Sequence, residues 1–310
     1  MHNGKLVFII GSERSGSTLL RLLLSHHPQV YIFSDSYDFL ISSLLKKDSD
    51  SLRIFNPFYR KIIVRFRNLI KSSTQPSEKI KKIIAICRKE TNKQYIGIQM
   101  HRNYKLVNMA FPRAKYIHLV RDPRPVCKSM IKFRWCGNYY YAAKKWLTSI
   151  SEVKNLQEAI LNENFLEIKY EKLVSKTKDV LNKICKFIGI AYTDEMFDYT
   201  KYTTYSYPSA ENVNNRNHSI SKKDIYLVES ITGETMQSYG YTLVHSQIWK
   251  PHFCGKFYLW LDNRIKRFLL HVRFIGITTY LRIKVNQILG VVIFRKADKK
   301  YTKKISAEIK

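Results

Sequence analysis

The sequence predicts an α/β fold in which a central parallel sheet, entered through a phosphate-loop-like turn, is covered by helices on both faces. The apolar run from Leu6 to Ile10 is typical of a strand that is buried on both sides. A glycine-bounded segment, residues 11–16, follows it directly. Farther along, strand-like runs alternate with helix-like segments, which is the pattern of a parallel sheet with covered faces. The hydrophobic share of 45% in 310 residues is enough for a substantial core.

The individual elements are predicted from apolar periodicity and from the residues that begin or end helices. In chain order we expect strand 6–10, helix 17–26, mostly helical basic residues over 40–90, strand 95–100, strand 114–120, helix 123–133, helix 139–161, strand 165–169, helix 175–188 and helix 221–239. Pro28 ends the first helix, whereas Pro123 suits the first turn of a helix. Gly189 is a typical C-terminal stop, and Ser221 to Asp224 resembles a capping box.

Charge is the unusual feature of the composition. The chain has 54 Lys and Arg against 24 Asp and Glu, which gives a net charge of +30. Such a field favours an anionic partner (nucleic acid, anionic lipid, acidic glycan or a phosphorylated cofactor), although biased composition explains the excess nearly as well. Residues 256–310 hold 14 of the cations and 3 of the acids, mixed with apolar side chains. We therefore expect one domain over 1–250 and a basic amphipathic helical extension over 251–310, which lies on an anionic membrane or packs on the domain.

The cysteines bear on compartment and on metal binding. Their number is odd, no two form a C-x-x-C pair, and their spacing with histidine matches no zinc site (Cys87, Cys127, Cys136, Cys185 and Cys254). The pattern predicts free thiols in a reducing compartment and no bound metal. The apolar run at 6–10 is short for a signal peptide, and no 18-residue stretch lacks charge. We expect a cytoplasmic protein, with membrane association through the extension as the alternative.

The first candidate binding segment lies between strand 6–10 and the helix that follows it. It reads Gly-Ser-Glu-Arg-Ser-Gly-Ser-Thr over residues 11–18. Backbone N–H groups at a helix N-terminus lack internal partners and carry partial positive charge, so they suit an anion. The glycines permit close approach, while hydroxyls and a guanidinium add donors. The candidate cofactor-binding residues are therefore Arg14, Ser15, Gly16, Ser17 and Thr18.

Other readings of this loop remain open. Glu13 occupies the position of the second glycine in a dinucleotide-binding G-x-G-x-x-G motif. A nucleoside-triphosphatase loop needs a lysine where Ser17 stands. Arg14 lies three residues earlier, which suits a shorter anion with fewer charges. An ordinary strand–helix turn with a serine cap is the remaining alternative.

The second candidate segment follows strand 114–120. Arg121 stands at its carboxyl end, where ligands of open parallel sheets bind, and Ser129 follows eight residues later in the next helix. A guanidinium fork and a hydroxyl together suit one phosphate. Residues 11–18 and the pair Arg121 and Ser129 thus form two separate anion-binding sites, which we call the two anion grips. Together they indicate a nucleotide that is phosphorylated at two places. The alternatives are that Asp122 is a carboxylate for Mg²⁺, or that Arg121 and Asp122 form a plain surface pair.

These two segments together resemble the sulfotransferase superfamily, in its bacterial and tyrosylprotein-like branch. The resemblance rests on Arg-Ser-Gly-Ser-Thr at 14–18 and on Leu-Val-Arg-Asp-Pro-Arg at 119–124 with Ser129. It is supported by His27-Pro28, by Tyr-Glu-Lys-Leu-Val at 170–174 and by Phe-Ile-Gly-Ile at 187–190, and it covers roughly residues 5–243. It implies a P-loop-NTPase-like fold. It also implies that the first loop holds the 5′-phosphosulfate of 3′-phosphoadenylyl sulfate, and that Arg121 and Ser129 hold its 3′-phosphate.

The resemblance also implies a reaction. The expected chemistry is in-line transfer of a sulfuryl group to a hydroxyl of a glycan, lipid or peptide tyrosine, with Arg14 near the leaving oxygen and no metal. The family has an acidic general base after its His-Pro; here Asp35 is the first candidate and Asp38 the second, although the usual residue is Glu. His101 is a candidate for acceptor binding or proton transfer. Arg216 stands in the region of the family's late loop, which helps to bind the 3′-phosphate.

Two other functions stay open on the sequence alone. A P-loop nucleotide kinase would bind ATP with Mg²⁺, but the loop lacks its lysine. A non-catalytic basic protein associated with membrane or nucleic acid would bind through charge alone. For the favoured reading we expect a nucleotide sulfuryl donor, an acceptor such as an acidic glycan or lipid, peripheral membrane contact through the extension, and no specific nucleic acid.

Overall fold

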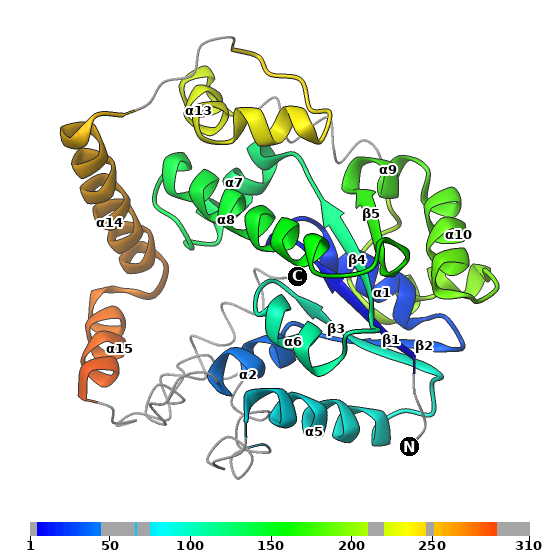
Figure 1. Ribbon diagram of the computed structural model, residues 1–310. Helices are drawn as coiled ribbons and strands as arrows, with labels where there is room; N and C mark the ends of the chain where they lie inside the picture. The colour runs from blue at the N-terminus through cyan, green and yellow to red at the C-terminus, as the bar shows by residue number, and fades with distance from the viewer. Residues whose placement is uncertain (1–4, 45–65, 67–74, 210–219, 246–250, 290–310) are drawn as a thin grey trace.

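The computed structural model describes residues 5–44, 66, 75–209, 220–245 and 251–289. Its centre is a parallel sheet in the order β2-β3-β1-β4-β5 (Figure 1). The strands are β1 (Lys5–Ile10), β2 (Val30–Phe33), β3 (Tyr95–Met100), β4 (Lys115–Val120) and β5 (Phe165–Lys169). This confirms the predicted fold class. The edge strand β2 was not predicted, because its four residues are too few to show a period.

Helices cover both faces of the sheet. In chain order they are α1 (Ser17–Ser25), α2 (Ser36–Leu44), α5 (Pro76–Lys89), α6 (Tyr104–Ala110), α7 (Pro123–Lys132), α8 (Tyr139–Glu158), α9 (Tyr170–Ser175), α10 (Thr177–Ile188), α11 (Tyr199–Tyr202), α13 (Lys222–Ser238), α14 (Phe253–Ile275) and α15 (Ile277–Leu289). Helices α2, α5, α6 and part of α8 pack on one face, and α1, α9 and α10 pack on the other (Figure 1). The domain therefore has three layers.

Alternation along the central strand explains this layering. Phe8 and Ile10 of β1 point into the core under α5 and α6, whereas Val7 and Ile9 point into the core under α1 and α10. All four side chains are fully buried. A third apolar cluster joins α7, α8 and α13 beyond the end of the sheet. The run at 6–10 is apolar throughout because both of its faces are covered.

Local signals in the sequence fix several helix boundaries. Asp122 accepts a hydrogen bond from the backbone N–H of Arg124 and so caps α7, which begins at Pro123. Ser221 caps α13 by accepting from the N–H of Asp224 at 3.1 Å, as the predicted capping box requires. Gly189, with φ of 90°, ends α10 in the left-handed conformation.

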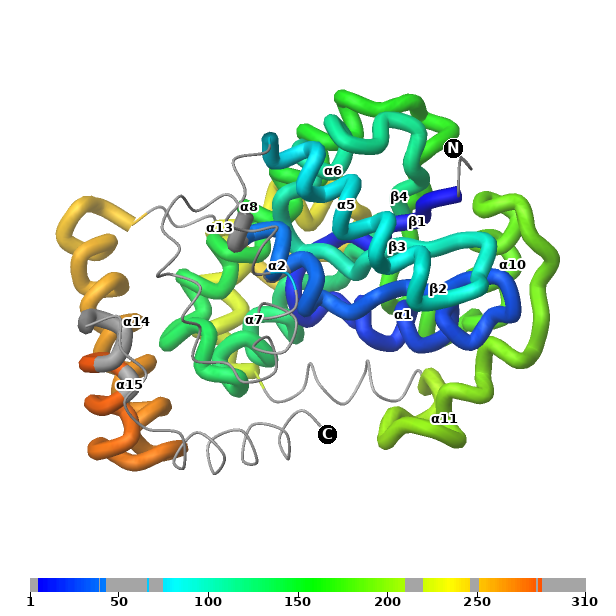
Figure 2. Tube along the Cα trace, turned by 90° about the horizontal axis from the view of Figure 1, so that it is seen from below, coloured from blue at the N-terminus to red at the C-terminus, as the bar shows by residue number. Residues whose placement is uncertain are grey.

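The C-terminal helices α14 and α15 stand together at one edge of the molecule, away from the sheet (Figures 1 and 2). The helical character predicted for the extension is thus observed over 253–289, while the domain boundary at 250 stays a prediction. Within the described ranges, none of the helices combines the length and the apolar character that crossing a bilayer requires.

Candidate functional site

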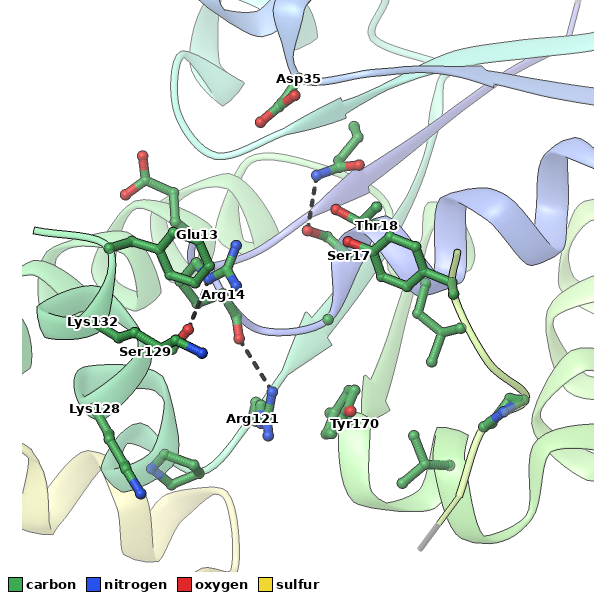
Figure 3. A pocket seen from close by; sticks show the side chains of 18 of the residues that line it. Glu13, Arg14, Ser17, Thr18, Asp35, Arg121, Lys128, Ser129, Lys132 and Tyr170 are labelled. Atoms are coloured by element: carbon green, nitrogen blue, oxygen red, sulfur yellow. Dashed lines mark hydrogen bonds between the residues drawn. The ribbon is translucent and has the colours of Figure 1, made fainter. Parts of the chain in front are cut away.

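A pocket of about 580 Å³ opens at the carboxyl ends of β1 and β4, where α1 and α7 begin (Figure 3). The loop between β1 and α1 forms its floor, α7 forms one wall, and residues 204–209 form the opposite wall. Carboxyl ends of parallel strands meet at the same edge of a sheet, so both predicted anion grips reach one cavity. The lining includes Arg14, Gly16, Ser17, Thr18, Arg121 and Ser129.

The loop after β1 is shaped for close approach by a ligand. Gly16 has φ of 96°, and a Cβ atom there would lie 2.3 Å from the Tyr170 ring. Arg14 also takes a left-handed conformation, with φ of 69°. Within the part of the chain that the structure describes, no side chain caps α1, which leaves its first-turn N–H groups available to an anion. The predicted residue Ser15 is fully buried and does not line the pocket, and its hydroxyl has no hydrogen-bond partner in the same described part.

The second grip lies beside the first. Arg121 is 5% exposed, its guanidinium stacks on the Tyr170 ring at 4.0 Å, and its Nη1 donates to the Arg14 carbonyl at 3.4 Å. Arg14 in turn donates from Nε to the Ser129 hydroxyl at 2.9 Å and stacks over Phe133 at 4.0 Å (Figure 3). The two predicted segments are therefore in direct contact.

Asp122 is linked to α7 and, through Arg124, to α13. Its carboxylate binds the guanidinium of Arg124 at 2.7 Å, and the same guanidinium reaches the buried Glu229 at 3.0 Å. Asp122 also caps α7 and does not line the pocket. These contacts favour a structural role for Asp122, and its two alternative roles stay predictions.

The two candidate bases occupy different environments. Asp35 lines the pocket and points into it from beyond β2 (Figure 3). Asp38 lies behind, on α2, where it is 2% exposed and accepts a hydrogen bond from the His101 backbone N–H at 3.0 Å. Burial raises the pKa of Asp38 to about 7, and Arg102 at 3.6 Å opposes that rise only in part. Asp35 is thus placed to meet a substrate, and Asp38 supports the strand end that carries His101.

The raised pKa of Asp38 makes stability depend on pH. The unfolded chain ionises this carboxyl near its ordinary value, whereas the folded chain resists ionisation up to about pH 7. The contribution of Asp38 to stability is therefore most favourable below about pH 4 and is lost as the pH rises to about 7. We expect wild type to lose about 2–3 kcal/mol relative to Asp38→Asn between about pH 5 and pH 8 in denaturant unfolding. A difference between the two proteins that stays constant with pH would exclude this role.

His101 belongs to a polar network at the end of β3. Its Nδ1 donates to the Gly11 carbonyl at 2.9 Å, which leaves Nε2 to accept from Gln99 at 3.2 Å. Gln99 also donates to the Ser17 hydroxyl at 3.0 Å. Burial lowers the pKa of His101, so the imidazole is held neutral. His101 therefore positions the anion loop as well as lining the pocket.

The model of the sulfotransferase family matches residues 7–194 of this chain. This chain belongs to the sulfotransferase family.

Similar proteins agree with that assignment. The protein-tyrosine sulfotransferase of Drosophila melanogaster is 24% identical over 214 residues, which are 64% of this chain and 40% of that protein. The 3-beta-hydroxysteroid sulfotransferase of Cavia porcellus is 26% identical over 164 residues, 46% of this chain and 51% of that protein. The chain thus spans about half the length of the curated relatives it matches.

Solved structures agree on the fold. The sulfotransferase domain from the Synechococcus PCC 7002 olefin synthase has a TM-score of 0.56 at 22% identity, covering 77% of this chain and 95% of that one. The sulfotransferase domain from the curacin biosynthetic pathway has a TM-score of 0.51 at 17% identity, covering 78% and 100%. This sulfotransferase-family chain therefore shares their P-loop-like architecture. Arg216 lies outside the described residues, so its expected contact with the 3′-phosphate stays a prediction.

The pocket of this sulfotransferase-family member also contains residues that the sequence did not single out. Glu13 binds Arg102 and Lys145 at 2.5 Å each. Burial alone would raise the pKa of Glu13, but these two cations outweigh it and lower the pKa below its usual value. Lys128 and Lys132 of α7 add positive charge along one wall (Figure 3). Their spacing of four residues places both on one side of α7, which is the signal that could have revealed them.

Proposed function

We propose that this protein transfers a sulfuryl group from 3′-phosphoadenylyl sulfate to a hydroxyl acceptor. The observation that carries the proposal is the union of two anion grips in one pocket, joined by the hydrogen bond from Arg14 to Ser129. The uncapped first turn of α1 and the hydroxyls of Ser17 and Thr18, which line the pocket, fit a sulfate or phosphate group. The loop at 14–18 would hold the 5′-phosphosulfate, and Arg121 with Ser129 would hold the 3′-phosphate.

Different residues of the pocket would have different roles in the transfer. The donor supplies the sulfuryl group and leaves as adenosine 3′,5′-bisphosphate; one sulfur–oxygen bond forms to the acceptor as the other breaks. Arg14 and the first-turn amides of α1 stabilise the charge that grows on the leaving oxygen. The carboxylate of Asp35 takes the proton of the attacking hydroxyl. His101, held neutral, keeps the end of β3 against the loop that carries Arg14, because its Nδ1 donates to the Gly11 carbonyl.

The acceptor is a hydroxyl compound, and we infer its chemical class from charge and from similarity. The net charge of +30 and the lysines on α7 favour acidic glycans, or lipids and saccharides at a membrane. Peptide tyrosine is the remaining class, and the similarity to a protein named as a protein-tyrosine sulfotransferase supports it. We place the protein in the cytoplasm, which its odd number of cysteines and the exposed thiol of Cys254 support.

A transfer assay tests the proposal. Wild-type protein and Asp35→Asn are incubated with donor carrying a labelled sulfuryl group and with glycan, lipid or peptide acceptors. We expect label on one acceptor class, and a large loss with Asp35→Asn. A failure to label any acceptor, combined with binding of ATP that requires Mg²⁺, would replace this proposal with a nucleotide kinase.

A further inference from the structure

Helix α14 is fastened to the domain along one narrow face. Leu259 and Asn263 are buried there. The Asn263 side-chain oxygen accepts from the Gly137 N–H at 2.7 Å, and Asn138 donates to the Leu259 carbonyl at 2.9 Å. A Cβ atom on Gly137 would lie 2.3 Å from the Asn263 carbonyl oxygen, so only glycine allows this close approach. These contacts fix which side of α14 faces outward.

The outward side of α14 is apolar. Phe257, Leu261, Ile265, Phe268 and Leu269 are all exposed, by 37–57%. At about 100° per residue they fall within one sector of the helix, opposite the buried pair that faces the domain. Side chains of this kind normally form a core. The helix therefore presents a continuous apolar face to the outside of the molecule.

Helix α15 extends the same surface. Ile277, Leu281 and Val285 recur every four residues along it and are all exposed. The ring of Phe268 meets the ring of Tyr280 edge-on at 5.1 Å, which holds the two helices together. The apolar faces of α14 and α15 thus form one patch at the edge of the molecule, larger than the single apolar side chains common on protein surfaces.

Positive charge borders this patch. Arg264 and Arg267 lie on one side of the apolar sector of α14, and Lys266 and Arg273 lie on the other; all four are exposed. Residues 253–289 contain seven Lys and Arg against Asp262 alone. A second copy of the chain would bring two such positive faces together, which repulsion opposes. Nucleic acid would satisfy the cations but leave the apolar sector without a partner.

We propose that the outer face of α14 and α15 binds an anionic membrane surface, with both helices lying in its plane. The apolar sector enters the boundary between headgroups and acyl chains, and the flanking cations meet the lipid phosphates. Each Lys or Arg near such a surface strengthens binding about fivefold. Because α14 is held by the segment that follows Trp135 on the rim of the pocket, membrane binding keeps the whole domain at the lipid surface.

Vesicle flotation with the full chain tests this surface independently of catalysis. Vesicles of phosphatidylcholine alone are compared with vesicles that contain about 30% phosphatidylglycerol. Wild type should bind the anionic vesicles at least about tenfold more tightly than the neutral ones. Leu261→Glu with Ile265→Glu should remove that binding. Leu161→Glu with Met109→Glu, which adds the same two charges at side chains that are each 62% exposed outside the patch, should not. Arg121→Ala should bind vesicles as wild type does, which separates this test from the proposed transferase function.

A second variant and a solution measurement make the result decisive. Arg264→Gln with Arg273→Gln should weaken vesicle binding by about fivefold for each cation removed. Equal binding to both kinds of vesicle, or vesicle binding that survives Leu261→Glu with Ile265→Glu, overturns the proposal. The proposal is also overturned if wild type does not bind vesicles and sedimentation shows a dimer that Leu261→Glu with Ile265→Glu dissociates. Unfolding temperatures of all variants close to that of wild type exclude a loss of fold as the cause.

Discussion

Asp35→Asn should lower kcat for sulfuryl transfer by about 10²–10⁴-fold, because the acceptor hydroxyl loses the carboxylate that takes its proton. Binding of adenosine 3′,5′-bisphosphate should stay within about twofold of wild type, since Asp35 lies apart from Arg121 and Ser129 in the pocket (Figure 3). Single-turnover rates with the labelled donor measure the first quantity, and calorimetry measures the second.

Asp38→Asn is the matched control for that change. It removes the same charge three residues away, but from a side chain that is 2% exposed and lies outside the pocket lining. The amide oxygen can still accept the hydrogen bond from the His101 N–H. We expect activity within about tenfold of wild type. If Asp38→Asn is as inactive as Asp35→Asn, Asp38 and not Asp35 is the general base.

Arg14→Ala should lower kcat by about 10²–10³-fold, the usual effect of removing one preorganised donor from a growing negative charge. The first-turn amides of α1 and Arg121 remain, so affinity for the bisphosphate should fall less than kcat does. Arg14→Lys keeps a cation and the same left-handed backbone, so it should recover part of the rate. A larger effect on affinity than on kcat would mean that Arg14 serves only to bind the donor.

The fold was predictable where a strand or a helix boundary is visible in the local sequence. The run at 6–10 is apolar throughout because helices cover both of its faces, and α7 and α13 begin at caps that are visible in the sequence. Strand β2 was missed because four residues are too few to show alternation of apolar and polar side chains. Helix α6 was missed because its seven residues are too few to show a helical repeat. The helix expected at 175–188 is α10, and α9 before it occupies the expected Tyr-Glu-Lys-Leu-Val segment.

The site was predictable as far as chain topology determines it. Arg14, Arg121 and Ser129 share a pocket because carboxyl ends of neighbouring parallel strands must meet. The depth of Asp38 depends on how α2 packs, and the network from Ser17 through Gln99 to His101 joins elements 82 residues apart. Neither follows from local spacing. The extension was expected to pack on the domain or to face lipid. Its described part does pack, with Leu259 and Asn263 buried and with Phe274 under the Arg134 guanidinium, but more of its apolar side chains face outward.

The proposed donor binding requires that Arg121 and Ser129 recognise a second phosphate of the same nucleotide that the loop at 14–18 holds. Calorimetry with adenosine 3′,5′-bisphosphate and with adenosine 5′-monophosphate measures this directly, in wild type and in Arg121→Ala. Wild type should prefer the bisphosphate by about 10–100-fold, the value of one or two charge-assisted hydrogen bonds, and Arg121→Ala should lose that preference. Equal affinity of wild type for both nucleotides, or a preference that survives Arg121→Ala, would contradict the account.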